Sequence, residues 1–294
     1  MQKHSLIGLL AGLTAASIWG GMYVVSKVVL EVIPPFALLT TRLVLGIAAL
    51  GIVIAFRAKA TMTRRQFWQF FLVGFVGYGI SLAFQFVGTK LSTASNGALV
   101  TSATPAFVLL FAPFLLSEKV TARRLVALVI STLGVLAVID PRNAELSPTL
   151  FWGNLSLLAA ALTWALYSVL VRKVSRTGDL LTASAVMLAG GIPTSLFFGF
   201  FEIQSQGMGA ITPGILGGIL FLGIISTAIA MFLWNYAFAE LPAAVASLTF
   251  FAQPVVGTIL GALFLGEKVT PLFLFGGLLI GIGLVIASTQ HVDR

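Results

Sequence analysis

The sequence predicts an all-α integral membrane protein of ten transmembrane helices, arranged as two inverted five-helix repeats. Three observations lead to this prediction. Hydrophobic residues make up 59% of the 294 residues and charged residues only 9%, whereas an ordinary soluble domain carries about 25% charged residues. Apolar segments of spanning length follow one another along the chain. A spaced motif also occurs twice in the same order.

The ten expected spans are separated by short breaks that carry proline, glycine or charge. The hydrocarbon core of a bilayer requires about 20 apolar residues of helix, which most of these segments supply. We place the spans at roughly residues 6–26, 35–56, 66–89, 92–116, 122–139, 149–171, 180–200, 213–238, 242–265 and 270–288, with a loop over 201–212. The first span runs on without a clear small-residue cleavage site, so we interpret it as an uncleaved helix and not a signal peptide.

The positive charges predict the orientation of the spans in the membrane. Lys and Arg residues that flank transmembrane helices gather on the cytoplasmic side. Most of the 17 Lys and Arg residues lie on one side of the membrane if the N-terminus is cytoplasmic, among them Arg57, Lys59, Arg64, Arg65, Lys119, Arg123, Arg124, Arg172, Lys173 and Arg176. We therefore expect a multi-pass protein of the bacterial inner (plasma) membrane with both termini in the cytoplasm.

One motif is repeated with constant internal spacing. Pro105 is followed by Glu-Lys-Val-Thr at 118–121, and Pro254 is followed by the same four residues at 267–270. We divide the chain into repeats at residues 1–145 and 146–294. Each repeat holds five spans, an odd number, so the second enters the membrane from the opposite side. Inverted repeats of this kind recur in carriers that alternate access to a midplane site.

These features resemble the drug/metabolite transporter superfamily, in its bacterial type with two EamA repeats, over almost the whole chain. The similarity is carried by WGGMYVVSK at 19–27, by Arg42 and by the duplicated proline and Glu-Lys-Val-Thr pattern. The resemblance implies ten helices, a central pathway lined mainly by helices 1, 3, 4, 6, 8 and 9, and export of small metabolites. A closer resemblance to the aromatic amino-acid exporters of that superfamily implies amino acids as substrates.

Polar and aromatic side chains at helical spacing mark the candidate substrate-binding site. Residues three, four or seven apart share a helix face, and a polar stripe on an apolar helix faces protein or water. Gathered from several spans, such side chains would form an aromatic-walled cavity that suits a small amphipathic solute. The candidates are Trp19, Tyr23, Tyr78, Ser81, Gln85, Ser102, Trp164, Tyr167, Ser168 and Gln253.

Simple helix packing is the competing interpretation for these residues. We favour pore lining for Trp19, Tyr78 and Trp164, which lie deeper in their spans than Trp68 and Trp152. The latter two are near span ends and are interpreted as interfacial anchors. For the serines both interpretations stay open, because serine often bonds its own helix backbone or a neighbouring helix.

Three further residues receive structural or gating roles. Arg42 is the only charge well inside a span, which makes it a functional hypothesis by default. It can attract a solute carboxylate, snorkel or pair with Glu31, and we favour a structural role. Pro105 and Pro254 lie inside expected spans, as static kinks or as gating hinges. Beside Pro254, Gln253 is the strongest candidate among the amides, because the proline removes a backbone donor and exposes a carbonyl nearby.

Several classes of function lack the residues they need. The chain has no cysteine, which excludes disulfides and thiolate metal sites. No Asp, Glu or His lies near the centre of a span. The spans therefore lack the titratable groups that intramembrane enzyme chemistry and tight proton coupling require. The positive charges behind the net charge of +8 lie in short runs between the spans. This distribution is typical of residues that orient spans in a membrane, and not of a nucleic-acid surface.

We therefore expect a transporter with no cofactor and no metal, and not an enzyme. Its expected partners are a small-molecule substrate and the lipid bilayer, and we expect a monomer or a weak dimer. Two alternatives stay open. One is an efflux carrier for drugs, quaternary amines or other metabolites, and the other is a passive channel or scramblase.

Overall fold

The computed structural model describes residues 3–57, 62–92, 100–139, 148–175, 178–265 and 271–288, and this part of the chain is helical and contains no strand. The helices of the first expected repeat are α1 (Lys3–Leu30), α2 (Pro35–Ala55), α3 (Arg64–Gly74), the π-helical η1 (Phe75–Ser81), α4 (Leu82–Leu91), α6 (Thr104–Leu116) and α7 (Ala122–Ile139). Those of the second are α8 (Pro148–Val174), α9 (Leu180–Gly190), α10 (Ile192–Gln206), α11 (Pro213–Leu220), the π-helical η4 (Phe221–Ile229), α12 (Ala230–Glu240), α13 (Ala243–Leu248), the 3-10 helix η5 (Thr249–Phe251), α14 (Ala252–Leu265) and α15 (Pro271–Ser288).

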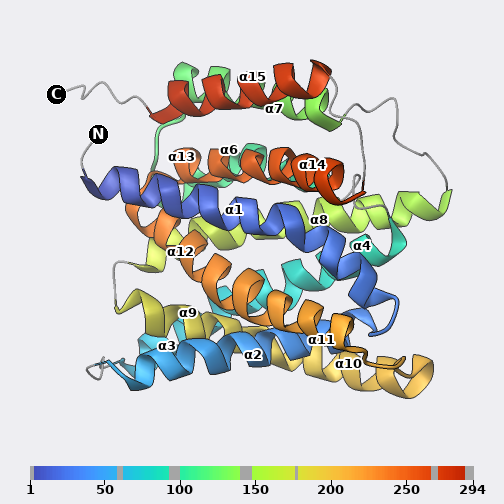
Figure 1. The fold of residues 1–294 in the computed structure, drawn as a ribbon. Coiled ribbons are helices and arrows are strands. Elements are labelled where there is room, and N and C mark those ends of the chain that lie inside the picture. The colour runs from blue at the N-terminus through green and yellow to red at the C-terminus, as the bar shows by residue number, and fades with distance from the viewer. Residues whose placement is uncertain are drawn as a thin grey trace.

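The helices lie side by side in stacked layers (Figure 1). α7 and α15 pack on each other and form one outer layer, while α2, α3, α9 and α10 lie at the opposite edge. Between them, α1 packs against α12 and α14, and α8 packs against α4 and α6. This central group carries the candidate site.

Six helical runs are long and apolar enough to cross a membrane, among the residues described. They are Ser5–Leu30, Pro35–Ala55, Arg64–Leu91, Phe151–Val174, Leu180–Gln206 and Pro213–Glu240. Shorter apolar helices cover Thr104–Leu116, Ala243–Gly257 and Leu274–Ala287. The chain is therefore a helical membrane protein.

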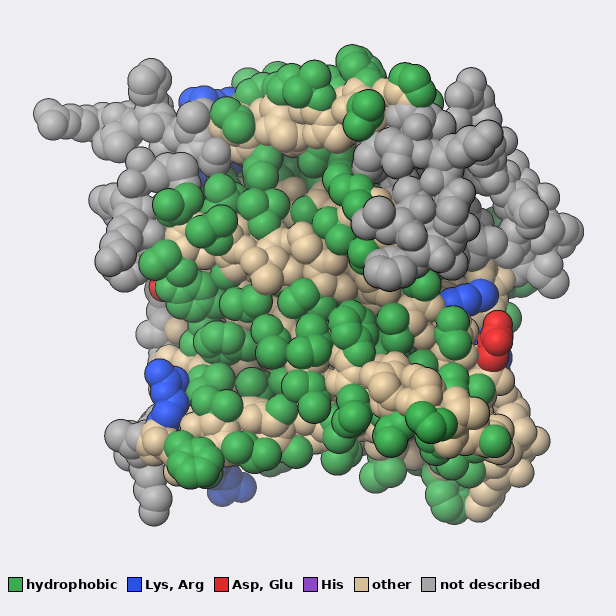
Figure 2. Space-filling view, viewed as in Figure 1, with side chains coloured by type: hydrophobic (Ala, Val, Ile, Leu, Met, Phe, Trp, Pro, Cys, Tyr) green, Lys and Arg blue, Asp and Glu red, His purple; other side chains and the backbone are tan. Residues whose placement is uncertain are grey.

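The surface is apolar over most of its area. Figure 2 shows hydrophobic side chains across the face in view, with Lys, Arg and acidic side chains at its margins. Large apolar side chains such as Phe114 and Val285 point outward, with 82% and 61% of their surface exposed. Trp68 and Trp152 are also exposed, as interfacial anchors must be. Such a surface fits lipid as its solvent.

Side-chain caps begin several of these helices. Thr63 and Gln66 form a reciprocal capping box at α3, and the carboxylate of Asp179 accepts a hydrogen bond from the Thr182 amide at α9. These bonds satisfy amide groups that have no partner inside the helix. The expected loop over 201–212 is wrong in part, because α10 continues to Gln206.

The prolines expected inside spans lie mostly at the start of a helix segment. Pro105 is in the first turn of α6 and Pro193 in that of α10, and Pro254 is the third residue of α14, which begins directly after the 3-10 turn of η5. Proline fits a first turn because its missing N–H would have no partner there. A turn at residues 102–103 precedes α6, so Pro105 lies beside a break between helical segments, whereas Pro113 lies inside α6.

Candidate functional site

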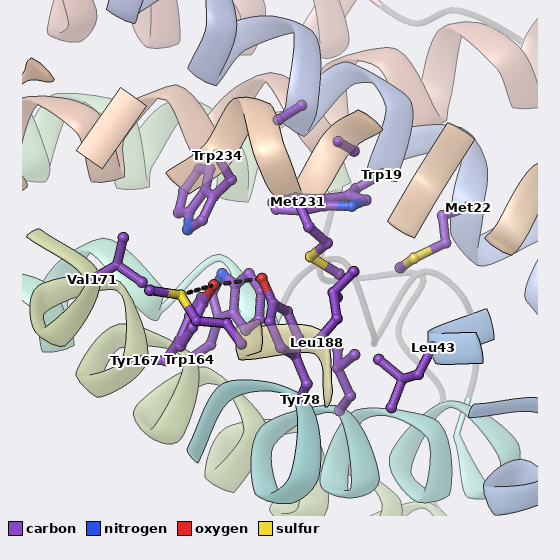
Figure 3. Packing of buried hydrophobic residues seen from close by; sticks show 14 of the residues in the cluster. Trp19, Met22, Leu43, Tyr78, Trp164, Tyr167, Val171, Leu188, Met231 and Trp234 are labelled. Carbon is purple, nitrogen blue, oxygen red and sulfur yellow. Dashed lines mark hydrogen bonds between the residues drawn. The ribbon is translucent and has the colours of Figure 1, made fainter. Parts of the chain in front are cut away.

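Helices from both halves of the chain bring an aromatic cluster to the middle of the molecule. Trp19 on α1, Trp164 on α8 and Trp234 on α12 are buried, and Figure 3 shows how they gather beside Tyr78 and Tyr167. The ring centroids of Trp19 lie 5.6 Å from Trp164 and 5.3 Å from Trp234. Edge-to-face and tilted pairs at these distances stabilise aromatic clusters beyond simple burial.

A narrow cavity of about 30 Å³ lies beside this cluster. It draws on the expected spans 1, 3, 4, 6, 8 and 9, the set implied by the resemblance. The lining residues are Trp19, Met22, Ser81, Leu82, Gln85, Thr101, Thr104, Ala160, Ala161, Trp164, Met231, Phe250 and Gln253.

Half of the ten candidate residues line this cavity directly. These are Trp19, Ser81, Gln85, Trp164 and Gln253. Tyr23 lies next to it, since its hydroxyl accepts a hydrogen bond from Gln85 Nε2 at 2.9 Å and shares one with Thr101 Oγ1 at 3.2 Å. Ser102 is buried but does not line the cavity, although both Thr101 and Thr104 do.

Two of the lining side chains carry polar atoms that have no partner. Among the described residues, the indole Nε1 of Trp164 makes no hydrogen bond, and neither does Nε2 or Oε1 of Gln253. The Gln253 amide is near the Tyr23 hydroxyl, but outside hydrogen-bonding geometry. By contrast, Ser81 donates to the Ala160 carbonyl at 2.8 Å. Buried polar atoms are rarely left without a partner. The polar atoms of Trp164 and Gln253 are therefore the ones most available to form hydrogen bonds with a solute.

Tyr78 and Tyr167 lie behind the cavity wall and bind each other. Their hydroxyl groups share a hydrogen bond, and Figure 3 shows them directed toward one another. Tyr167 also donates to Asn235 Oδ1 at 2.6 Å, and Asn235 Nδ2 donates to Ser184 Oγ at 3.0 Å. Ser168 has a similar role, because it accepts the indole N–H of Trp234 at 3.0 Å. The structure thus places these candidates in a supporting network.

Removing the Tyr167 hydroxyl should destabilise the protein. In Tyr167→Phe, the buried Asn235 oxygen loses its donor, and we expect the free energy of unfolding to fall by about 1–3 kcal/mol. Tyr236→Phe is the matched control, since the structure shows no hydrogen bond to that hydroxyl within the described residues. Reversible unfolding of both variants in SDS measures the difference. Equal stability of the two variants would contradict the network.

One expected role of Arg42 was to snorkel toward the membrane surface, and its side chain does not do so. Its side chain has no exposed surface and points from α2 into the protein. Its Nε donates to the Leu222 carbonyl at 3.3 Å and to Thr227 Oγ1 at 3.1 Å. No ion pair with Glu31 forms among the described residues, because these inward bonds hold the guanidinium away from the helix end.

Several lining residues were not predicted, although the sequence contains signals for some. Met22 lies three residues after Trp19, and Phe250 lies three residues before Gln253, so each shares a face with a predicted residue. Trp234 was also missed. The segment FQFVGTKLS at 84–92 aligns with WNYAFAELP at 234–242. Trp234 therefore belongs to the repeat copy of the segment that contains the predicted site residue Gln85. No comparable signal marks Thr101.

Comparison with known proteins finds one family model that matches the chain twice. The model is described as the EamA-like transporter family, and it matches residues 6–139 and 151–289. A solved crystal structure has a similar fold, with a TM-score of 0.79 and 21% sequence identity over 95% of this chain and 96% of that chain.

Similar proteins from several organisms are named as transporters. The uncharacterized transporter YyaM of Bacillus subtilis is 25% identical over 92% of this chain and 89% of that protein. A probable amino-acid metabolite efflux pump of Salmonella typhimurium is 26% identical over 95% of this chain and 93% of that protein. An uncharacterized transporter of Archaeoglobus fulgidus is 24% identical over 99% of this chain and its own full length.

Proposed function

Because the chain belongs to the EamA-like transporter family, within the drug/metabolite transporter superfamily, we propose that it exports small amphipathic metabolites through the central cavity. Amino acids, including aromatic ones, are the proposed substrates. The family and the relatives are transporters and not enzymes, so the chain is a transporter and its substrate is carried unchanged. The relative named as an amino-acid metabolite efflux pump supports this substrate class.

The unpartnered atoms of Trp164 and Gln253 carry the proposal. They offer two donor nitrogens and one acceptor oxygen inside a cavity whose walls are mostly aromatic and aliphatic. A few oriented polar groups in an apolar pocket are typical of small-molecule sites. The rings of Trp19 and Trp164 would contact an apolar side chain, while the amide of Gln253 would bind the polar end of the solute.

An inverted-repeat architecture of ten spans, with repeats at 1–145 and 146–294, fits this function. Support comes from the family model, which matches each half once, and from the π-helical segments η1 and η4, which lie at corresponding places. An equivalent hydrogen bond occurs in each half. Lys27 at the end of α1 donates to the Ser92 carbonyl after α4, at 2.9 Å. Arg172 at the end of α8 donates to the Ala239 carbonyl of α12, at 3.0 Å. We propose that the two halves rock to alternate access.

The bacterial inner membrane is the proposed location, with both termini in the cytoplasm. The bias of Lys and Arg toward one side supports this orientation. The start of α1 and the end of α15 lie at the same side of the molecule in Figure 1. We keep a monomer or weak dimer as the proposed assembly, with solute flow down its own gradient as the proposed energy source.

Efflux of quaternary amines is the second candidate function. The faces of Trp19, Trp164 and Phe250 lie in or beside the cavity wall, and aromatic faces attract cations. An uptake screen in proteoliposomes with labelled amino acids, nucleosides and quaternary amines separates the two candidates. Saturable counterflow of a substrate would distinguish a carrier from a channel.

Substitutions of the two unpartnered side chains test the proposed site. Trp164→Phe removes the free indole N–H and Gln253→Leu removes the free amide. We expect each to lower the rate of amino-acid uptake into proteoliposomes by about tenfold, the effect of losing one buried hydrogen bond to the solute. Trp152→Phe is the matched control, because Trp152 is 66% exposed on the outer surface. Wild-type rates in both site variants would remove the proposed site.

A further inference from the structure

The guanidinium of Arg42 is held firmly along only one of its edges. Nε donates to the Leu222 carbonyl at 3.3 Å and to Thr227 Oγ1 at 3.1 Å. The ring of Phe86 lies 4.9 Å from Cζ, in cation–π contact. These contacts fix the plane of the guanidinium, because Thr227 is itself anchored to the Leu222 carbonyl.

The Nη1–Nη2 edge at the end of the guanidinium meets only neutral acceptors among the described residues, and these contact Nη2 alone. Nη1 has no hydrogen-bond partner in the part of the chain that the structure describes, although it is buried. Nη2 donates to Ser226 Oγ at 3.3 Å and to the Met22 sulfur at 3.6 Å, and a thioether is a weak acceptor. All these acceptors are neutral, and no carboxylate of the described residues forms an ion pair with Arg42. A buried charge without a counter-ion is costly, so this edge lacks the partner it fits best.

That edge adjoins the central cavity through Met22. Met22 lines the cavity and its sulfur contacts Nη2, so one flexible side chain lies between the guanidinium and the cavity. Figure 3 shows Met22 and Met231 extending into the same space beside Trp19. A methionine side chain has three rotatable bonds and repacks readily. Its movement would open a path from the cavity to Arg42.

We propose that the Nη1–Nη2 edge of Arg42 is a carboxylate subsite of the transport cavity, gated by Met22. A planar guanidinium binds a carboxylate with two parallel hydrogen bonds, and the missing counter-charge would come from the solute. The proposal rests on the proposed function and narrows it. It assigns organic carboxylates, amino acids among them, as substrates and disfavours quaternary amines that carry no acid group.

Three probes that share one ring test the subsite. L-phenylalanine has an amine and a carboxylate, 3-phenylpropanoate has only the carboxylate, and phenethylamine has only the amine. We expect the wild type to transport the two carboxylates in preference to phenethylamine. Arg42→Gln should lower uptake of the carboxylates at least about tenfold, as expected for a lost bond to a charged group. Uptake of phenethylamine should change little, and Arg42→Lys should restore part of the carboxylate uptake.

Ser226→Ala is the matched control, because it removes one acceptor of Nη2 and leaves the Nε anchors in place. Carboxylate preference should survive in this variant. If Arg42 only tethers helices, Arg42→Gln will lower the uptake of all three probes equally, and that result overturns the proposal. Transport of phenethylamine by the wild type at the rate of phenylalanine also overturns it.

A measurement of ligand binding that does not depend on transport distinguishes this proposal from the proposed function. A ligand that binds the folded state raises its melting temperature, so we expect 3-phenylpropanoate to stabilise the purified wild type and not Arg42→Gln. Such stabilisation without saturable uptake of any probe would retain the subsite and refute transport. Uptake of phenylalanine that is unchanged in Arg42→Gln would refute the subsite and retain transport. Equal stabilisation by chloride would assign the edge to an inorganic anion and overturn the proposal.

Discussion

Replacing Gly74 by valine is expected to leave almost no folded protein in the membrane. Gly74 on α3 lies against the backbone of Met187 on α9, and Gly190 on α9 lies against the backbone at Phe71 and Phe75. A β-carbon on Gly74 would overlap the Met187 carbonyl group, which cannot rotate away as a side chain can. Overpacking of a core costs about 1–3 kcal/mol and occasionally more. Here two helix backbones must separate, so the loss should exceed that range.

The matched control for this prediction lies on α15. Gly277→Val adds the same atoms at a position with nothing within 4 Å among the described residues. We expect normal yield for Gly277→Val and loss of the monodisperse peak in size-exclusion chromatography for Gly74→Val. Equal yield of the two variants would show that α3 and α9 are not in backbone contact.

The helix positions were predictable because hydropathy and length suffice in a bilayer. Each expected span contains helix wherever the structure describes it, from 6–26 at α1 to 270–288 at α15. The internal breaks were not predictable. The π-helical segments η1 and η4 and the 3-10 turn η5 depend on the packing of neighbouring helices, and hydropathy carries no information on that packing. The Glu-Lys-Val-Thr copy at 267–270 lies outside the described residues, as do Lys59 and Arg176.

The candidate site was predictable in part from helix faces. Trp19, Trp164 and Gln253 line the cavity, because polar and aromatic side chains at helical spacing turn inward. Tyr78 and Tyr167 turn inward too, but each takes the other as its partner. Spacing gives the face of one helix, whereas the partner of a side chain depends on how two helices are rotated against each other.

Replacing Glu118 by alanine should open the cavity on the side of the membrane where Glu118 lies. Its Oε1 accepts hydrogen bonds from Arg172 Nε at 3.0 Å and from the Ala243 amide at 3.1 Å. Arg124 lies 3.7 Å from Oε2. Glu118 follows α6 in the first half, while Arg172 and Ala243 belong to the second. Ser117, with a φ of 55°, turns the chain at the end of α6. This cluster fastens the two proposed repeats together at one end.

A single cysteine in the cavity can report this opening, because the chain has no cysteine of its own. Thr104→Cys places a thiol at a lining position. Truncating one partner of a buried charge pair costs about 2–5 kcal/mol. The lower end applies here, since the Glu118 and Arg172 side chains are 16% and 15% exposed. A shift of about 2 kcal/mol toward the open state would raise the rate of thiol modification roughly 30-fold.

The direction of labelling distinguishes a gate from general loosening. A membrane-impermeant thiol reagent should modify Thr104→Cys faster in the Glu118→Ala background only when it is added to the Glu118 side of sealed vesicles. Glu118→Gln should give a smaller increase, since an amide oxygen still accepts from Arg172 and the Ala243 amide. Glu31→Gln is the matched control, because the Glu31 side chain has no partner in the described chain and is exposed. Faster modification from both sides would mean that Glu118 stabilises the fold and does not control access.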